Sequence, residues 1–352
     1  MLYNVKNPHG GDVYSAEIRL DFSSNVNPLG TPPGVIAAIR DAAALVRQYP
    51  DPYCRALVAA IAAHEQVPED AILCGNGAAE LIYAYCEAVL PGRAMELAPT
   101  FSEYSAAASH FGAALSRHLL SQNDDFALRD DFLSALQAQK PDVLFLCTPN
   151  NPTGRTIPRA LLARILALCR AQGTRVFLDE CFLDFTDAAS VKDLLPQYPN
   201  LLILKAFTKN YALAGMRVGC CMSCDRALLA KMAACTQPWN VSVPAQAAGV
   251  AALRETGWVQ RAKALLPQAR GALSQGLRSF GFYVCPSEAN YLLFRAPAGL
   301  DAALLREKIA IRNCGNYQGL GPGWFRTAVR LPDENKALLD AMQRVMEDTT
   351  WR

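Results

Sequence analysis

Short, continuously apolar runs alternate with amphipathic segments between about residues 70 and 250. Examples of the apolar runs are AILC at 71–74, VLFLC at 143–147 and LLILKAF at 201–207. A strand without polar alternation is buried on both faces, as in a parallel sheet that is covered by helices on each side. The pattern therefore predicts an α/β fold with a mostly parallel central sheet.

The clearest connecting helix is predicted at residues 157–173. Pro158 lies in its first turn and Gly173 stands where a helix commonly stops. Between them, apolar side chains recur at helical spacing, at Leu161, Leu162, Ile165 and Leu168. The runs on either side, 143–147 and 175–180, are therefore expected to be neighbouring strands that are joined by a right-handed crossover.

The pattern changes after residue 252. A long helical segment comes first, followed by strand candidates at 283–287, 290–296 and 325–331 and a closing helix at 333–347. This order of elements is typical of a smaller α+β unit. We expect a large domain at 41–252 and a small α+β domain at 253–352, completed by an N-terminal arm at 1–40.

Composition narrows the possible partners. The net charge of the 352 residues is only +2 and 19% of them are charged, which does not favour binding of nucleic acid or of a membrane surface. The N-terminus lacks a signal-peptide pattern and no apolar run is long enough to span a bilayer, so we expect a cytoplasmic protein. Six of the twelve cysteines lie inside apolar runs, which is typical of reduced thiols. Cys221 and Cys224 have metal-like spacing, but without a second pair or a nearby histidine we expect no metal site.

Candidate chemistry lies where the apolar runs end, because open α/β sheets bind ligands outside the carboxyl ends of their strands. Asp179 is costly to bury there unless it is paired, either as a helix cap or ion-pair partner or with a protonated ring nitrogen such as that of pyridoxal phosphate. Lys209 can form a Schiff base once burial and nearby positive charge lower its pKa, with Lys205 as a rival. Arg217 can bind a phosphate and supply that charge.

Two loops add to this set. GNGAAEL at 75–81 follows a strand and opens a helix, which offers backbone N–H groups to an anion. It lacks the third glycine of a dinucleotide fingerprint and the lysine of a P-loop, which disfavours a nicotinamide enzyme or an NTPase. CTPNNPTG at 147–154 places two asparagines between rigid prolines, so that one amide can donate to a phenolate oxygen.

CTPNNPTG, LDECFLDF at 178–185 and LKAFTKNYALAGMRVG at 204–219 occur in an order and spacing that resemble the class I/II aminotransferases, pyridoxal-phosphate enzymes of fold type I. The resemblance implies a seven-stranded, mostly parallel sheet between helices in the large domain. Within the family, the chain is similar to the histidinol-phosphate aminotransferase branch and, inside it, to the threonine-phosphate decarboxylases of cobalamin biosynthesis. The stretches that favour these decarboxylases are HGG at 9–11, LDFSSNVNPLGTP at 20–32, QPWNVSVPAQAAG at 237–249 and NCGNYQGL at 313–320.

The resemblance also implies roles for individual residues. Lys209 would form the Schiff base with pyridoxal 5′-phosphate, and Asp179 would pair with its ring nitrogen. Asn151 would bond its O3′ and Phe101 would stack on the ring. The cofactor phosphate would be held by Gly77, Ala78, Ala79, Thr208 and Arg217.

Other implied roles concern the substrate and a second subunit. Arg326 would receive the substrate carboxylate, and the remaining substrate-binding candidates are His9, Gly10, Asn25 and Arg330. The alternatives are a solvated position on the arm for His9 and a surface salt bridge for Arg330. Tyr49 matches a tyrosine that reaches the neighbouring subunit's cofactor phosphate, which implies a homodimer with shared active sites.

Three departures from the family pattern concern the cofactor. Ala206 stands where relatives place a serine or threonine, three residues before the lysine. Phe182 stands where many aminotransferases have a tyrosine that bonds O3′, although the decarboxylases resemble this chain there. Ala78 and Ala79 replace more polar residues of the phosphate loop.

The resulting expectation is pyridoxal-phosphate-dependent decarboxylation of a phosphorylated amino acid such as threonine phosphate. The alternative is an aminotransferase that acts on a phosphorylated or aromatic amino acid with 2-oxoglutarate or glutamate, since both reactions need the same residues around the cofactor. A cofactor-sensing regulator is the non-catalytic alternative. It would need a DNA-binding module, for which we expect no room ahead of His9.

Overall fold

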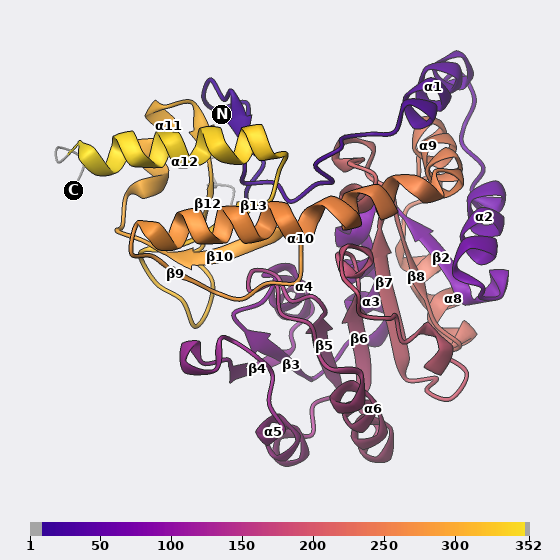
Figure 1. Ribbon diagram of the computed structural model, residues 1–352. Helices are drawn as coiled ribbons and strands as arrows, with labels where there is room; N and C mark the ends of the chain where they lie inside the picture. The colour runs from indigo at the N-terminus through magenta and orange to yellow at the C-terminus, as the bar shows by residue number, and fades with distance from the viewer. Residues whose placement is uncertain (1–8, 349–352) are drawn as a thin grey trace.

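A computed structural model describes residues 9–348, and a seven-stranded sheet forms its centre (Figure 1). All neighbouring strands pair in parallel except at β8, which is antiparallel to both of its neighbours. The expected mostly parallel α/β sheet is therefore confirmed. In spatial order its strands are β2 (Ile72–Gly75), β8 (Gly219–Met222), β7 (Leu201–Ala206), β6 (Arg175–Asp179), β5 (Val143–Cys147), β3 (Arg93–Ala98) and β4 (Ala114–Leu119).

Helices cover both faces of this sheet, which explains why the central strands carry no polar alternation. In β5, Phe145 belongs to one hydrophobic cluster while Leu144 and Leu146 belong to another on the opposite face. The first cluster includes residues of α3 (Gly77–Val89), α4 (Glu103–His110) and α8 (Arg226–Cys235). The second includes residues of α2 (Arg55–Glu65), α5 (Asp131–Gln139), α6 (Arg159–Gln172) and α9 (Val243–Arg254).

The predicted crossover helix is confirmed as α6. It begins after Pro158 and ends at Gly173, whose φ of 77° is the left-handed conformation that glycine adopts without strain. Its flanking strands β5 and β6 pair in parallel, with Val143 opposite Arg175.

A second, antiparallel sheet of four strands lies beside the first, and α10 (Thr256–Ser279) connects the two regions (Figure 1). The arm contributes β1 (Leu20–Asp21), which pairs with β11 (Ile309–Ala310), whereas α1 (Pro33–Ala42) packs on α9. The domain limits at residues 41 and 253 stay a prediction. The second sheet consists, in spatial order, of β12 (Arg312–Asn313), β13 (Trp324–Ala328), β10 (Tyr291–Arg295) and β9 (Tyr283–Val284), and two further helices are α11 (Leu300–Arg306) and α12 (Pro332–Glu347).

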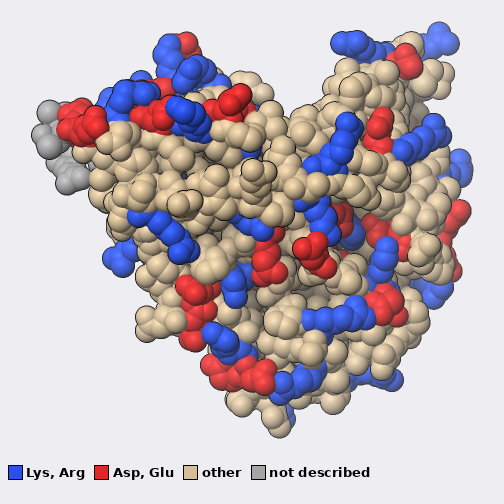
Figure 2. Space-filling model, in the orientation of Figure 1, with Lys and Arg blue, Asp and Glu red and all other residues tan. Residues whose placement is uncertain are grey.

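Ten of the twelve cysteines are buried, Cys224 and Cys235 are half-buried, and all twelve are free thiols. Within residues 9–348, no cluster of three or more histidine, cysteine or acidic side chains is arranged to hold a metal ion. None of the helices in that same range combines the length and the apolar character that crossing a bilayer requires. On the face shown in Figure 2, basic and acidic side chains are intermixed.

Candidate active site

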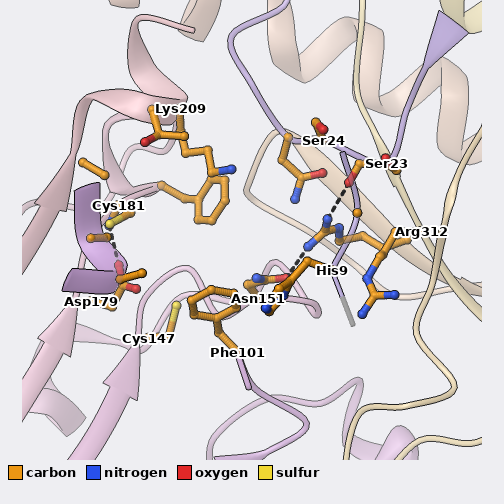
Figure 3. A pocket seen from close by; sticks show the side chains of 18 of the residues that line it. His9, Ser23, Ser24, Phe101, Cys147, Asn151, Asp179, Cys181, Lys209 and Arg312 are labelled. Carbon is orange, nitrogen blue, oxygen red and sulfur yellow. Dashed lines mark hydrogen bonds between the residues drawn. The ribbon is translucent and has the colours of Figure 1, made fainter. Parts of the chain in front are cut away.

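One cavity opens where β5, β6 and β7 end, and the arm and the second sheet close it from the other side. Figure 3 shows Lys209 and Asp179 on one side of it and Ser23, Ser24 and Arg312 opposite. The predicted residues that line the cavity are His9, Gly10, Asn25, Ala78, Ala79, Phe101, Asn151, Asp179, Thr208, Lys209, Arg217 and Arg326. The structure thus brings together residues that lie more than 300 positions apart in the sequence.

Lys209 lies in α7 (Phe207–Asn210), a single helical turn that directly follows β7. Burial lowers the pKa of its ammonium to about 8, and the positive charges of Arg326 and Arg217 act in the same direction. Cys181 and Asp179 oppose this shift of the pKa. An amine with such a pKa is partly neutral near pH 7 and can attack an aldehyde.

Lys205, the rival lysine, has the opposite environment. Its ammonium lies 3.2 Å from both Glu65 and Asp184, and these carboxylates raise its pKa although burial opposes them. A lysine held in the charged form is a poor nucleophile. The electrostatics therefore favour Lys209 over Lys205.

Asp179 ends β6 and is buried. Its Oδ2 accepts a hydrogen bond from the Tyr104 hydroxyl at 2.6 Å, and its Oδ1 accepts one from the Cys181 backbone N–H at 2.8 Å. Burial raises the pKa of this carboxyl group, while those two bonds and the charge of Lys209 partly offset the shift. A cationic ring nitrogen beside Asp179 would stabilise the carboxylate and offset much of the free-energy cost of burying it.

The turn between β2 and α3 forms a cradle for an anion. Gly77 has a φ of 79°, and a Cβ atom there would stand 2.6 Å from Nη2 of Arg217. The guanidinium therefore lies against bare backbone at the N-terminus of a 13-residue helix, where N–H groups point outward. Ala78, Ala79 and Thr208 line the cavity next to this turn.

The two asparagines of CTPNNPTG have different environments. Asn150 is turned into the protein, where it accepts from the Thr100 hydroxyl at 2.7 Å and donates to the Pro99 carbonyl at 2.9 Å. Asn151 faces the cavity, and its Oδ1 accepts from Nη1 of Arg326 at 2.5 Å. Only Asn151 is therefore placed to contact a ligand.

Arg326, on β13, is held by neutral groups. Its Nη2 donates to the Ser23 carbonyl at 2.8 Å. With its amide oxygen turned toward the guanidinium, Asn25 accepts from Nε of Arg326 at 3.1 Å. Arg326 is only 7% exposed and its charge faces the cavity, which suits it for an anionic ligand.

The arm reaches the cavity at His9. Its Nε2 lies 2.7 Å from Oε1 of Glu103 on α4, and its ring lies 5.8 Å from that of Phe101, centroid to centroid. Gly10 allows this approach, since a Cβ there would stand 2.6 Å from the Ser23 carbonyl oxygen. Figure 3 shows His9 beside Asn151 and Phe101.

Gly77 belongs to the turn beside the cavity, and two other predicted residues lie elsewhere. Tyr49 is 78% exposed and stacks on Trp239, with the ring centroids 4.6 Å apart, so its expected contact with a second subunit stays a prediction. Arg330 does not line the cavity: its guanidinium pairs with Glu334 at 2.7 Å and donates to the Asp21 carbonyl. The structure gives it a role in joining β13, α12 and the arm.

The sequence did not indicate several lining residues. Tyr104 carries no motif of its own, and its role depends on the fold that brings it to Asp179. Arg312 lies on the two-residue strand β12, which is too short to show a periodic pattern. The other unanticipated lining residues are Ser23, Ser24, Cys147, Cys181 and Tyr317.

The fold and this site define a class of protein: an α/β enzyme with a buried lysine and an aspartate at neighbouring strand ends. The family model for aminotransferase class I and II matches residues 17–342, and the chain belongs to that family. It is 37% identical to threonine-phosphate decarboxylase of Salmonella typhimurium over 96% of each chain. It is 34% identical to histidinol-phosphate aminotransferase 1 of Cupriavidus pinatubonensis, covering 93% of this chain and 88% of that protein.

A solved structure agrees with the family assignment. The histidinol-phosphate aminotransferase from Clostridium acetobutylicum superposes with a TM-score of 0.87 at 28% identity, covering 94% of this chain and 99% of that one. The expected fold type I architecture is therefore confirmed, and the chain is a pyridoxal-phosphate-dependent enzyme.

The residues present fit pyridoxal 5′-phosphate. Gly77, Arg217 and the N-terminus of α3 form a cradle that a Cβ atom would fill, and Asp179 is a buried acid suited to a ring cation. Phe101 lines the same cavity, where a ring could stack on it. Ala206 and Phe182 also line the cavity and bring no hydroxyl to it, as the sequence indicates.

Proposed function

We propose that the protein decarboxylates a phosphorylated amino acid such as threonine phosphate. The observation that carries this proposal is a pair of buried guanidinium groups. Arg312 and Arg326 face each other across β12 and β13, and both line the cavity that contains Lys209. They are 9% and 7% exposed.

Two buried cations on one wall favour a substrate with two anionic groups. A buried guanidinium is costly without a negative partner, and the described hydrogen-bond partners of Arg326 are neutral. A planar guanidinium can donate two parallel hydrogen bonds to the oxygens of a carboxylate or a phosphate. A phosphorylated amino acid carries one of each, and His9 stands nearby as a further basic group.

The choice of decarboxylation is supported by the similarity to the Salmonella protein, which is named for that reaction. Bound pyridoxal phosphate supplies an electron sink for the pair that is released when a bond to Cα of the amino acid breaks. The arginines hold the anionic ends of the substrate, so their placement decides which bond to Cα breaks. Lys209 Nζ then returns a proton to Cα, and the products are carbon dioxide and aminopropanol phosphate.

The test is incubation of the holoenzyme with threonine phosphate, with carbon dioxide and aminopropanol phosphate measured separately. We expect both products in equal amounts, and none from Lys209→Ala. Arg312→Met should raise KM for threonine phosphate much more than KM for unphosphorylated threonine, because the latter lacks the second anion. Absence of both products from the wild-type protein would remove the assignment.

The second candidate is transamination, which the similarity to histidinol-phosphate aminotransferases favours. Histidinol phosphate incubated with 2-oxoglutarate would then yield glutamate. Glutamate formation without release of carbon dioxide from threonine phosphate would decide for the aminotransferase.

We further propose a cytoplasmic homodimer with shared active sites, acting in cobalamin biosynthesis. The exposed stack of Tyr49 on Trp239 supports the dimer, because large aromatic side chains on the surface are typical of contact sites. The place in cobalamin biosynthesis follows from the resemblance to the threonine-phosphate decarboxylases.

A further inference from the structure

A short stretch of the arm, residues 23–27, touches both ends of the proposed active site. At one end, the Ser23 carbonyl and the Asn25 amide contact Arg326. At the other end, Asn27 contacts the turn that carries Lys209. The arm therefore connects the candidate carboxylate-binding arginine to the candidate Schiff-base lysine through five residues.

Asn27 makes two hydrogen bonds to the turn that carries Lys209. Its backbone N–H donates to the Lys209 carbonyl at 2.9 Å, and its Nδ2 donates to the Asn210 carbonyl at 2.8 Å. Its Oδ1 accepts from the Leu29 N–H at 2.9 Å, which fixes the orientation of the amide. The residue is 1% exposed, so water does not compete for these bonds.

The helix that accepts these bonds, α7, is only four residues long. Because α7 is only one turn, the carbonyl groups at its C-terminal end lack the i+4 partners of a longer helix, and that of Lys209 accepts a long local bond from the Ala212 N–H at 3.4 Å. Asn27 supplies partners to two consecutive carbonyls from a position 183 residues away in the sequence. On the other side, Asn210 Nδ2 donates to Asp184, which also pairs with Lys205. The backbone at Lys209 and Asn210 is thus held from two sides.

We infer that Asn27 is a positioning residue for Lys209. A lysine that carries a proton to and from Cα must move its side chain while its backbone stays fixed, and a displacement of about 1 Å can cost roughly 100-fold in rate. Asn27 fixes that backbone and ties it to the segment that contacts Arg326. The inference rests on the catalytic role of Lys209 in the proposed function, and it names a residue that does not line the cavity.

The test compares the holoenzymes of Asn27→Ala and Asn200→Ala. Asn200 is a matched control, since its Nδ2 also donates to a backbone carbonyl, that of Thr174, at 2.8 Å, but at the opposite ends of β6 and β7. We expect Asn27→Ala to lower kcat roughly ten-fold or more while KM changes less than about three-fold. Asn200→Ala should lose a similar amount of thermal stability and keep its kcat.

A second readout does not depend on which substrate is correct. The absorbance of bound pyridoxal phosphate is titrated with pH, and its midpoint should move in Asn27→Ala but not in Asn200→Ala. A wild-type protein that releases no carbon dioxide would then refute the proposed function and leave this inference standing. If Asn27→Ala does not fold, the isosteric Asn27→Asp keeps the acceptor for Leu29 and removes the donor to Asn210. Unchanged kcat and an unchanged midpoint in the folded variant would overturn the inference.

Discussion

Lys205, near the end of β7, and Lys209, in the helical turn that follows, show how strongly the surroundings decide the chemistry of a residue. The pKa of Lys209 is lowered to about 8 by burial and by Arg326 and Arg217, whereas acids raise the pKa of Lys205. The charge of Arg217 could be anticipated from the sequence, because it follows in the same loop. Glu65 and Arg326 come from distant segments, so the difference between the two lysines needs the folded chain.

The rate at which the apo-protein captures pyridoxal phosphate should rise with pH through about 8. Below that pH Lys209 is mainly an ammonium and cannot attack the aldehyde; above it the amine is neutral and the rate levels off. Stopped-flow absorbance after mixing measures the rate. A midpoint near 10.5, the ordinary value for lysine, would contradict the lowered pKa.

A matched pair of variants tests the cause of this shift. Arg326→Met should move the midpoint of the capture rate to higher pH. Removing this cation removes its repulsion of the Lys209 ammonium, which raises the pKa of Lys209. Arg330→Met should leave the midpoint in place, because the Arg330 charge is already paired with Glu334.

At the scale of elements, the turn between β2 and α3 shows what a local motif can and cannot reveal. GNGAAEL indicates an anion site from its place between a strand and a helix. The left-handed backbone at Gly77 is one reason for a glycine, but a second reason is not local, since the space beside it is filled by Arg217 from a loop 140 positions later. The sequence thus predicted the kind of site, and the structure identifies the contact that constrains it.

Gly77→Ala should weaken retention of pyridoxal phosphate about ten-fold or more, because the new Cβ pushes the Arg217 guanidinium out of the cradle. Equilibrium dialysis with absorbance detection measures the retained cofactor. Gly112→Ala is the control, because Gly112 has a similar φ of 85° but open space around its Cβ position. Both variants should lose about 1 kcal/mol of folding stability from the left-handed backbone. Equal cofactor retention in the two would show that the contact with Arg217 is not needed.

At the scale of the whole molecule, the parallel sheet was predictable and the second sheet only partly so. Both faces of β5, β6 and β7 are covered, so each strand appears in the sequence as a continuous apolar run. The pattern of residues in β8 does not indicate that this strand is antiparallel to its neighbours. Arg312 could not be assigned to the site because β12 has two residues, and only its pairing with β13 brings Arg312 opposite Arg326.

The protein should sediment as a dimer, and Tyr49→Ser should shift it toward the monomer. Tyr49, Tyr53 and Trp239 are exposed aromatic residues, and such surfaces gain stability when a second copy covers them. Sedimentation velocity over a range of concentrations measures the equilibrium. Tyr14→Ser is the matched control, because Tyr14 is more exposed than Tyr49 but lies on the arm. A monomeric wild-type protein would contradict the shared-site proposal.

The reactivity of the buried cysteines reports how often the core of the protein opens to solvent. Burial raises the pKa of Cys86, Cys169 and Cys220 to about 12, so hardly any reactive thiolate exists while the core is closed. Cys86 and Cys169 belong to hydrophobic clusters on opposite faces of the sheet. The speed at which an alkylating reagent marks each cysteine therefore reports how often that layer is exposed to solvent. A single mass-spectrometric time course can show whether the two layers separate together or one before the other.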